Sequence, residues 1–251
     1  MTTQSKIDRA EELEGTPTGS SPVSKELRRT WRLILLGGPG VGKGTQGELL
    51  KLRLGISHIS TGDLFRAAGS RKAGNRTPAM MAALQYMHRG ELVPDSTVWE
   101  LVREQSDSLR SREGFLLDGF PRTLAQAEML RTFLEGEKIP LSAVVEYEMP
   151  TSEIVMRLSG RRICAKCRTV FHVQWRPTKT EGVCDECGGR VYRRDDDNPE
   201  SIATRLEAYK RSTAPLIDFY KNLGALLPVD AAGTPEEVFA RTMAALQSRA
   251  G

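Results

Sequence analysis

Short hydrophobic runs alternate along this chain with longer segments in which hydrophobic residues recur every three or four positions. The runs predict buried β-strands over residues 32–36, 56–59, 115–117, 143–148 and 225–229. The periodic segments predict helices over residues 45–53, 62–68, 97–109, 124–134, 199–221 and 235–248. Because a helix follows nearly every strand, the pattern predicts an α/β fold with a five-stranded parallel sheet flanked by helices.

Two segments interrupt this alternation, and a third precedes it. Residues 60–93 read as helical without a strand of their own, and residues 160–197 combine four cysteines, a short β-prone run and many arginines. Both predict insertions into an α/β core formed by residues 29–59, 94–159 and 198–251. Residues 1–28 include a run of small polar residues and prolines that cannot bury a core, and they predict a flexible extension.

Composition narrows the class of protein. The 251 residues are 39% hydrophobic and 27% charged, which supports a buried core and excludes wholesale disorder. No run approaches the roughly 18 apolar residues of a membrane-spanning helix, and the N-terminal region lacks a signal-peptide pattern, so we expect a cytoplasmic protein without a membrane partner. The net charge of +4 is mild for a nucleic-acid binder, but residues 157–194 contain ten Lys and Arg against three Asp and Glu. We expect this basic segment to meet phosphates.

All four cysteines lie in the basic segment, as two Cys-x-x-Cys pairs: Cys164 with Cys167, and Cys184 with Cys187. Two such pairs on tight turns have the spacing of a four-cysteine zinc site, in which four thiolates complete a tetrahedral shell. A redox role is the alternative, but redox Cys-x-x-Cys motifs occur singly on a βα unit. His172 lies between the pairs and is a competing ligand. The spacing favours one structural Zn²⁺ held by the four cysteines.

The first predicted strand is followed directly by the sequence GGPGVGKGT (37–45), and a predicted helix comes next. A glycine-rich turn in this position lets several backbone N–H groups converge on one phosphate, at the positive end of the following helix. Lys43 supplies a mobile positive charge for a polyphosphate, and the Thr45 hydroxyl can meet phosphate or Mg²⁺. The motif therefore predicts nucleotide binding. Gly47 lies inside the following helix, where glycine costs about 1 kcal/mol relative to alanine.

Asp118 comes directly after the strand predicted over 115–117, and a turn and Arg122 follow it. Ligands of open α/β sheets bind at the carboxyl ends of the strands. Asp118 is therefore placed to hold Mg²⁺, through water, beside the phosphate loop, and Arg122 is expected to face the same crevice. The alternative role of Asp118 is to cap the helix predicted over 124–134.

Seven motifs, in order along the chain, resemble those of the adenylate kinases, in particular the bacterial type with a long, zinc-bearing lid. They are GGPGVGKGT (37–45), STGDLFRAA (60–68), GELVPD (90–95), DGFPRTLAQA (118–127), GRRIC (160–164), RDDD (194–197) and TAPLIDFY (213–220). The resemblance implies a P-loop core of the nucleoside monophosphate kinases, a helical AMP-binding insertion at 60–93 and a zinc-bearing β lid at 160–197. It also implies reversible, Mg²⁺-dependent phosphoryl transfer from ATP to AMP that gives two ADP under a closing, arginine-rich lid. We expect a monomer that binds these small molecules and no nucleic acid.

The resemblance further implies a role for individual residues of this chain. The expected catalytic residues are Lys43, Arg122, Arg157, Arg161, Arg194 and Arg205. The residues expected to contact ATP are Gly40, Val41, Gly42, Lys43, Gly44, Thr45, Arg157, Arg161, Val170, Phe171 and Gly233. The residues expected to contact AMP are Thr61, Arg66, Glu91, Leu92, Val93, Gly119, Phe120, Pro121, Arg122, Gln126, Arg194 and Arg205. Within the AMP set, Arg66 and Arg122 are expected to bind the phosphate, and Gln126 to read the edge of the adenine.

Two other functions share parts of this pattern. A sister kinase that uses GTP as donor, or UMP and CMP as acceptors, would keep the phosphate loop. Thr61 and Gln126 favour AMP, however, and the long cysteine lid argues against the short-lid UMP/CMP enzymes. A zinc-ribbon nucleic-acid binder on a degenerate nucleotide-binding fold would not need Lys43 or Asp118, and both are present. The stretch over residues 67–89 is about four residues longer than is usual in the family.

Overall fold

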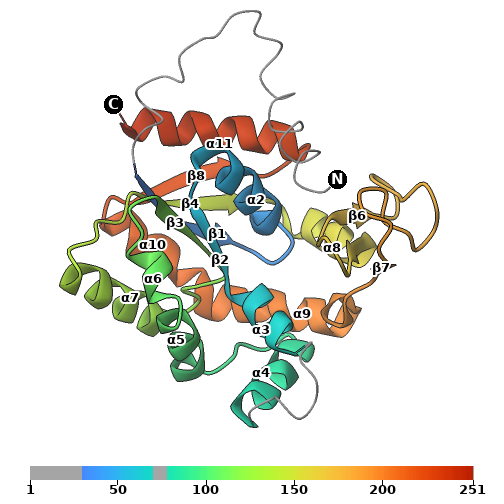
Figure 1. The fold of residues 1–251 in the computed structure, drawn as a ribbon, viewed down its shortest axis with the longest axis horizontal. Coiled ribbons are helices and arrows are strands. Elements are labelled where there is room, and N and C mark those ends of the chain that lie inside the picture. The colour runs from blue at the N-terminus through green and yellow to red at the C-terminus, as the bar shows by residue number, and fades with distance from the viewer. Residues whose placement is uncertain (1–29, 70–77, 251) are drawn as a thin grey trace, which may run out of the picture.

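Five parallel strands form the central sheet of the protein. The computed structural model describes residues 30–69 and 78–250, so the extension predicted over 1–28 lies outside the described residues. The strands are β1 (Trp31–Gly37), β2 (Ser57–Ser60), β3 (Gly114–Asp118), β4 (Ala143–Glu148) and β8 (Leu226–Asp230). They lie side by side in the order β2-β3-β1-β4-β8 (Figure 1). Every neighbouring pair is parallel, which confirms the predicted α/β class.

Helices cover both faces of this sheet. They are α2 (Lys43–Leu54), α3 (Thr61–Gly69), α4 (Pro78–His88), α5 (Asp95–Arg103), α6 (Ser106–Leu109), α7 (Leu124–Gly136), α8 (Thr151–Gly160), α9 (Pro199–Ala208), α10 (Pro215–Asn222) and α11 (Pro235–Ala250). One face packs mainly against α5, α7 and α10, and the opposite face against α2, α8 and α11. Among the described residues, no helix combines the length and the apolar character that crossing a membrane requires.

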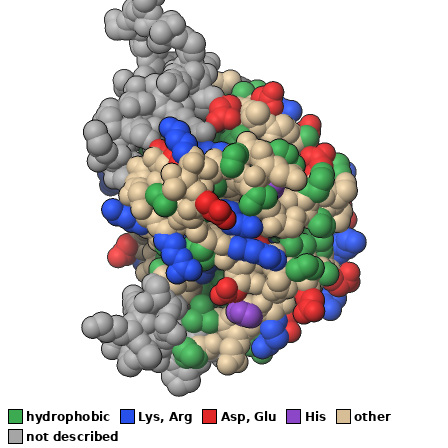
Figure 2. Space-filling model, turned by 90° about the vertical axis from the view of Figure 1, so that its right-hand side faces the viewer, with side chains coloured by type: hydrophobic (Ala, Val, Ile, Leu, Met, Phe, Trp, Pro, Cys, Tyr) green, Lys and Arg blue, Asp and Glu red, His purple; other side chains and the backbone are tan. Residues whose placement is uncertain are grey.

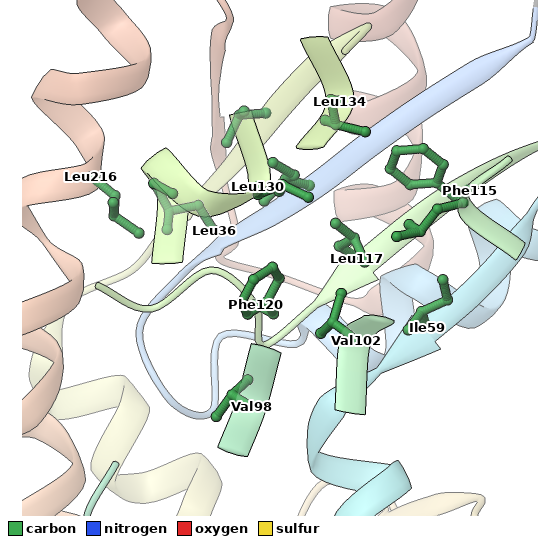
Figure 3. Close-up of a cluster of buried hydrophobic side chains, with 14 of the residues drawn as sticks. Leu36, Ile59, Val98, Val102, Phe115, Leu117, Phe120, Leu130, Leu134 and Leu216 are labelled. Atoms are coloured by element: carbon green, nitrogen blue, oxygen red, sulfur yellow. The ribbon is translucent and has the colours of Figure 1, made fainter. Parts of the chain in front are cut away.

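Side chains that alternate along β1 divide the core into two layers, because successive residues of a strand point to opposite faces. Ile34 and Leu36 belong to the layer with α5 and α7, and Leu33 and Leu35 to the layer with α2 and α11. Figure 3 shows the first layer, in which side chains of β1 and β3 meet those of α5 and α7. Each fully buried side chain of this kind stabilises the fold by about 1.5–3 kcal/mol relative to an exposed one. The carboxyl ends of β1 and β3 are therefore anchored to a well-packed base.

A second, smaller sheet lies within residues 160–197, which we call the lid segment. Its antiparallel strands are β5 (Arg161–Cys164), β6 (Val170–His172) and β7 (Val191–Tyr192), in the order β6-β5-β7. The buried cluster of this segment consists of Cys164, Phe171 and Cys184. On the face of the molecule that carries it, Lys and Arg side chains lie among hydrophobic and acidic ones (Figure 2). The buried cluster of the lid segment is so small that the segment needs a further cross-link to hold its shape.

Two helices expected from the sequence are each divided in the structure. The helix predicted over 97–109 forms α5 and α6, and the one predicted over 199–221 is interrupted by a π-helical turn at Tyr209–Thr213. In this turn the N–H of Ala214 donates to the carbonyl of Tyr209 at 2.8 Å. The next residue, Pro215, has no N–H to continue the ladder, so α10 begins there as a separate helix.

Candidate active site

A cavity of about 1270 Å³ opens at the carboxyl ends of the adjacent strands β1 and β3. The lid segment, α8, α9 and the loop after β8 complete its walls. Pockets for one small molecule usually measure about 300–1,000 Å³, so this cavity has room for more than one ligand. The residues predicted to contact a nucleotide or Mg²⁺ that line it are Gly40, Val41, Gly42, Lys43, Gly44, Thr45, Arg66, Glu91, Leu92, Asp118, Gly119, Pro121, Arg122, Arg157, Arg161, Val170, Phe171, Arg194, Arg205 and Gly233.

The phosphate-loop sequence connects β1 to α2 and forms one edge of the cavity. Gly42 precedes α2 with a φ of 103°, a left-handed conformation that glycine adopts without steric cost. No side chain in the described part of the chain caps this helix, so its first N–H groups remain available to an anion. The Nζ of Lys43 donates to the carbonyl oxygens of Gly37 and Gly38, at 2.7 Å each. The loop thus holds one cation and several N–H groups at the same place.

Several cationic side chains converge on this loop. Burial, with the nearby guanidiniums of Arg122, Arg205 and Arg161, lowers the pKa of Lys43 to about 8, although Asp118 opposes the shift. Burial also lowers the pKa of Arg122, and Arg194 adds to this effect. Positive charges held this close repel one another in a partly dry site. The converging cations are Lys43, Arg122, Arg161, Arg194 and Arg205. Their arrangement favours a bound polyanion.

Two aspartates of the lid segment hold three of these arginines. Asp197 accepts hydrogen bonds from Arg161 at 2.8 and 2.5 Å and from Arg205 at 3.2 Å. Asp196 accepts two from Arg194, at 2.7 and 2.5 Å. Burial alone would raise the pKa of Asp196, but the guanidiniums of Arg194 and Arg205 hold it well below its usual range. The RDDD run marks these aspartates in the sequence, whereas the pairing of Asp197 with Arg161 follows only from the fold.

Asp118 ends β3 beside the phosphate loop, next to a buried histidine that the sequence analysis did not single out. The Nε2 of His58 lies 3.8 Å from Asp118 Oδ2, and its Nδ1 lies 2.9 Å from Glu48 Oε1. Burial alone would lower the pKa of His58, but the carboxylates of Asp118 and Glu48 raise it to about 9. A Cβ on Gly47 would lie 2.7 Å from two atoms of this ring, so the glycine in α2 makes room for the histidine.

The four cysteines of the lid segment form one cluster. Their Sγ atoms all lie within 4.8 Å of one another, and the Cys164–Cys187 and Cys167–Cys184 pairs are 3.5 Å apart. None of the four forms a disulfide. Zn–S bonds of about 2.3 Å place tetrahedral ligands about 3.8 Å apart, so the cluster fits one structural Zn²⁺. The N–H groups of Lys166 and Cys167 donate to Cys164 Sγ at 3.4 and 3.5 Å, so the backbone of the first Cys-x-x-Cys turn curls around this sulfur.

Comparison with known proteins identifies the family. A family model described as adenylate kinase matches residues 35–225 of the chain. The chain belongs to the adenylate kinase family. Among its relatives are the adenylate kinases of Carboxydothermus hydrogenoformans, Streptomyces avermitilis and Caldicellulosiruptor saccharolyticus, with identities of 47, 46 and 49%. The alignments cover 86, 86 and 78% of this chain, and 99, 97 and 89% of the respective relatives.

Membership of the adenylate kinase family confirms the resemblance that the seven motifs indicated. The chain is a kinase that transfers phosphoryl groups reversibly between nucleotides. An adenylate kinase of this kind accounts for a phosphate loop facing converging arginines, which a nucleic-acid binder on a degenerate fold would not need.

Four residues predicted to contact AMP in this adenylate kinase are buried and do not line the cavity. They are Thr61, Val93, Phe120 and Gln126. Both polar groups of the Gln126 amide are engaged by the protein: Oε1 accepts from the N–H of Arg122 at 2.8 Å, and Nε2 donates to Asp95 Oδ1 at 2.6 Å. The amide thus braces the backbone of Arg122, and its contact with adenine stays a prediction.

Two residues predicted to contact ATP in this adenylate kinase contact each other. The Nη2 of Arg157, on α8, donates to the carbonyl oxygens of Ala231 and Gly233, at 3.2 and 3.1 Å. Burial lowers the pKa of Arg157. The helix that leads into the lid segment is therefore joined to the loop after β8 at one side of the cavity.

Proposed function

We propose that this enzyme transfers a phosphoryl group from Mg²⁺-bound ATP to AMP and gives two ADP, with the lid segment closing over the ATP. The observation that carries the proposal is that Lys43 of the phosphate loop lines one cavity together with four arginines, Arg122, Arg161, Arg194 and Arg205. An ATP phosphate chain in line with the phosphate of AMP carries several negative charges, and such a ligand stabilises cations that repel one another. The size of the cavity and the relatives named adenylate kinase support the same conclusion.

On the donor side, we assign the ATP phosphates to the backbone of residues 40–45, with Lys43 on the β- and γ-phosphates. Arg161 reaches the same phosphates from the start of the lid segment, where Asp197 already orients its guanidinium. The remaining contacts that we assign to ATP come from Arg157, Val170, Phe171 and Gly233.

On the acceptor side, we assign the AMP phosphate to Arg66 and Arg122. Arg194 and Arg205 engage the AMP and the transferring group between the two nucleotides. The walls of the AMP pocket come from residues 91, 92, 119 and 121, which line the cavity, whereas the neighbouring Val93 and Phe120 are buried. Thr61 and Gln126 brace the second wall through their hydrogen bonds to Gly119 and Arg122. Gln126 reads the adenine edge only if its hydrogen bonds to Asp95 and Arg122 are exchanged for the base.

Phosphoryl transfer leaves little covalent work to side chains, so catalysis depends on alignment and on neutralising charge. Asp118 and the Thr45 hydroxyl supply the oxygen ligands that a hydrated Mg²⁺ prefers, and this ion when bound adds positive charge at the phosphates. Two unit charges 4 Å apart interact by about 1 kcal/mol in water and about 4 kcal/mol at an effective dielectric constant of 20. A closed lid therefore strengthens the attraction between each arginine of the site and the phosphates, and it keeps water away from the phosphoryl group.

We also assign a separate task to each part of the chain. Residues 29–59, 94–159 and 198–251 form the core, residues 60–93 the AMP-binding insertion and residues 160–197 the lid, which one structural Zn²⁺ holds in shape. The enzyme acts as a monomer in the cytoplasm on small nucleotides, without a nucleic-acid or membrane partner.

The test is a coupled assay of ADP formation by the purified, metal-replete enzyme from ATP and AMP, with GTP as the alternative donor. We expect ADP from ATP and AMP, and we expect Lys43→Met and Arg122→Ala to reduce turnover by more than about a hundredfold while circular dichroism stays unchanged. Arg103→Ala, an exposed arginine of α5, is the matched control and should keep its turnover. A folded enzyme that forms no ADP, or that prefers GTP, contradicts the proposal.

A further inference from the structure

The two cysteine knuckles of the lid segment share one backbone conformation but differ at one residue. In the first, the N–H of Arg168 donates to the carbonyl of Cys164 at 3.1 Å; in the second, the N–H of Gly188 donates to that of Cys184 at 2.8 Å. The φ angles of Arg168 and Gly188 are 64° and 67°. A Cβ is unfavourable in this left-handed region, so the knuckle itself favours glycine. The arginine in the first knuckle therefore needs an explanation outside the knuckle.

The side chain of Arg168 supplies that explanation, because it reaches the insertion at residues 60–93. Its Nη2 donates to Oδ1 of Asp63, in the first turn of α3, at 2.5 Å. The two residues are 105 positions apart in the sequence and both line the large cavity. The contact thus joins the lid segment to the insertion.

The same carboxylate oxygen holds an arginine of the proposed AMP site. Asp63 Oδ1 accepts hydrogen bonds from Arg66 Nη2 at 2.7 Å and from Arg66 Nε at 3.2 Å. Partial burial would raise the pKa of Asp63, but Arg66 and Arg168 lower it to about 2, so the carboxylate stays charged. Burial and the neighbouring Arg194 lower the pKa of Arg66 to about 10. Asp63 therefore holds Arg66 in a crowded positive region.

We propose that Arg168 is a positioning residue for AMP: through Asp63 it holds the Arg66 guanidinium, and with it the insertion, against the lid segment. The inference rests on the proposed function, since it takes Arg66 as a ligand of the AMP phosphate. Arg168 acts on Arg66 through Asp63, and in this role it does not contact the reacting atoms. A left-handed arginine in the first knuckle follows directly, because this knuckle faces the carboxylate of Asp63 across the cavity.

The ion pair between Arg168 and Asp63 is weak enough for a lid segment that closes and reopens in each turnover. The side chains of Arg168 and Asp63 are 40 and 51% exposed, and exposed ion pairs of this kind shift an equilibrium by about two- to fivefold. A contact of this size biases the insertion toward the lid segment without locking it there. Reopening for product release stays fast.

The first experiment measures position without catalysis. Spin labels on non-natural residues at the exposed positions Gln85 and Glu181 report the distance between the insertion and the lid segment in the nucleotide-free enzyme. We expect Arg168→Gly to shift the distance distribution to longer values, and to have no effect in the Asp63→Asn background. Arg190→Ala is the matched control: it removes an exposed arginine of the lid segment that makes no ion pair within the described residues. An unchanged distribution in Arg168→Gly, with zinc content as in the wild type, overturns the proposal.

The second experiment separates positioning from direct phosphate binding. We expect Arg168→Gly to raise the KM for AMP by about two- to fivefold, with kcat changed less than about twofold, and to leave the KM unchanged in the Asp63→Asn background. An equal rise in both backgrounds assigns Arg168 to the phosphate itself and overturns the positioning role. An enzyme that forms no ADP contradicts the proposed function instead, while the distance measurement remains interpretable.

Discussion

Single carboxylates organise the charge of the cavity. Asp63, Asp196 and Asp197 each pair with two arginines. Pairing of this kind orients the guanidiniums before a phosphate arrives, which reduces the reorganisation needed at the moment of reaction. The sequence motifs predict which arginines of the chain belong to the site, because these arginines stand at fixed positions of the family motifs. The partners could not be predicted in this way, since Asp63 and Arg168 meet only in the folded chain.

The raised pKa of His58 predicts how the stability of the protein depends on pH. Its pKa is about 9 in the folded protein and about 6.5 in the unfolded chain, so the protonated ring stabilises the fold. This stabilisation is complete below pH 6.5 and is lost as the pH rises through 9. Urea unfolding in Mg²⁺-free buffer should therefore show that His58→Gln loses about 3 kcal/mol more stability at pH 6 than at pH 9.5.

Glu48→Gln is the matched control for this measurement, because it removes one of the two carboxylates that raise the pKa of His58. We expect the pH dependence of the loss to shrink in this background. A loss of stability in His58→Gln that is equal at both pH values would show that folding does not raise the pKa of His58.

The strands were more predictable from the sequence than the helices. Strands buried on both faces read as continuous apolar runs, and all five predicted strands lie within two residues of the observed bounds. The helix α8 was not predicted, because Ile154, Val155 and Met156 form an unbroken apolar run without a helical period. Val155 and Met156 are 41 and 50% exposed in the structure, so burial does not explain their apolar character.

The position of Gly47 in α2 predicts how a substitution there changes the stability of the protein. Helix propensity alone predicts that Gly47→Ala stabilises the protein by about 1 kcal/mol. The structure predicts the opposite, a loss of about 1–3 kcal/mol, because the new Cβ would lie 2.7 Å from the His58 ring. Chemical denaturation of the single variants and the double variant measures the coupling. In the His58→Ala background, Gly47→Ala should become neutral or stabilising; stabilisation with His58 present would contradict the packing argument.

The whole molecule combines a two-layered core with a lid segment that has almost no hydrophobic core of its own. Structural zinc contributes roughly 10–16 kcal/mol of apparent binding free energy in small modules. We therefore expect elemental analysis to find about one zinc per chain. After chelation, amide exchange should become fast in β5, β6 and β7 while β1 and β3 stay protected.

Cys184→Ser should reproduce the effect of chelation, because it removes one of four ligands of the proposed site. Turnover should fall with the zinc content, while the far-ultraviolet circular dichroism of the core changes little. A lid segment that keeps its amide protection in the metal-free protein would refute the structural role of the metal.

The register between β1 and β3 has a consequence for how proteins with this fold can evolve. Leu35 pairs with Asp118, so backbone hydrogen bonds and two hydrophobic layers set the spacing between the phosphate loop and the carboxylate. The lid segment joins this body after Gly160, at a single helix-to-strand junction on that side. Substitutions in the lid outside its arginines, aspartates and cysteines therefore leave the spacing of the inner wall of the site unchanged. Exchanging whole lids between homologues at this junction is the corresponding route for protein engineering.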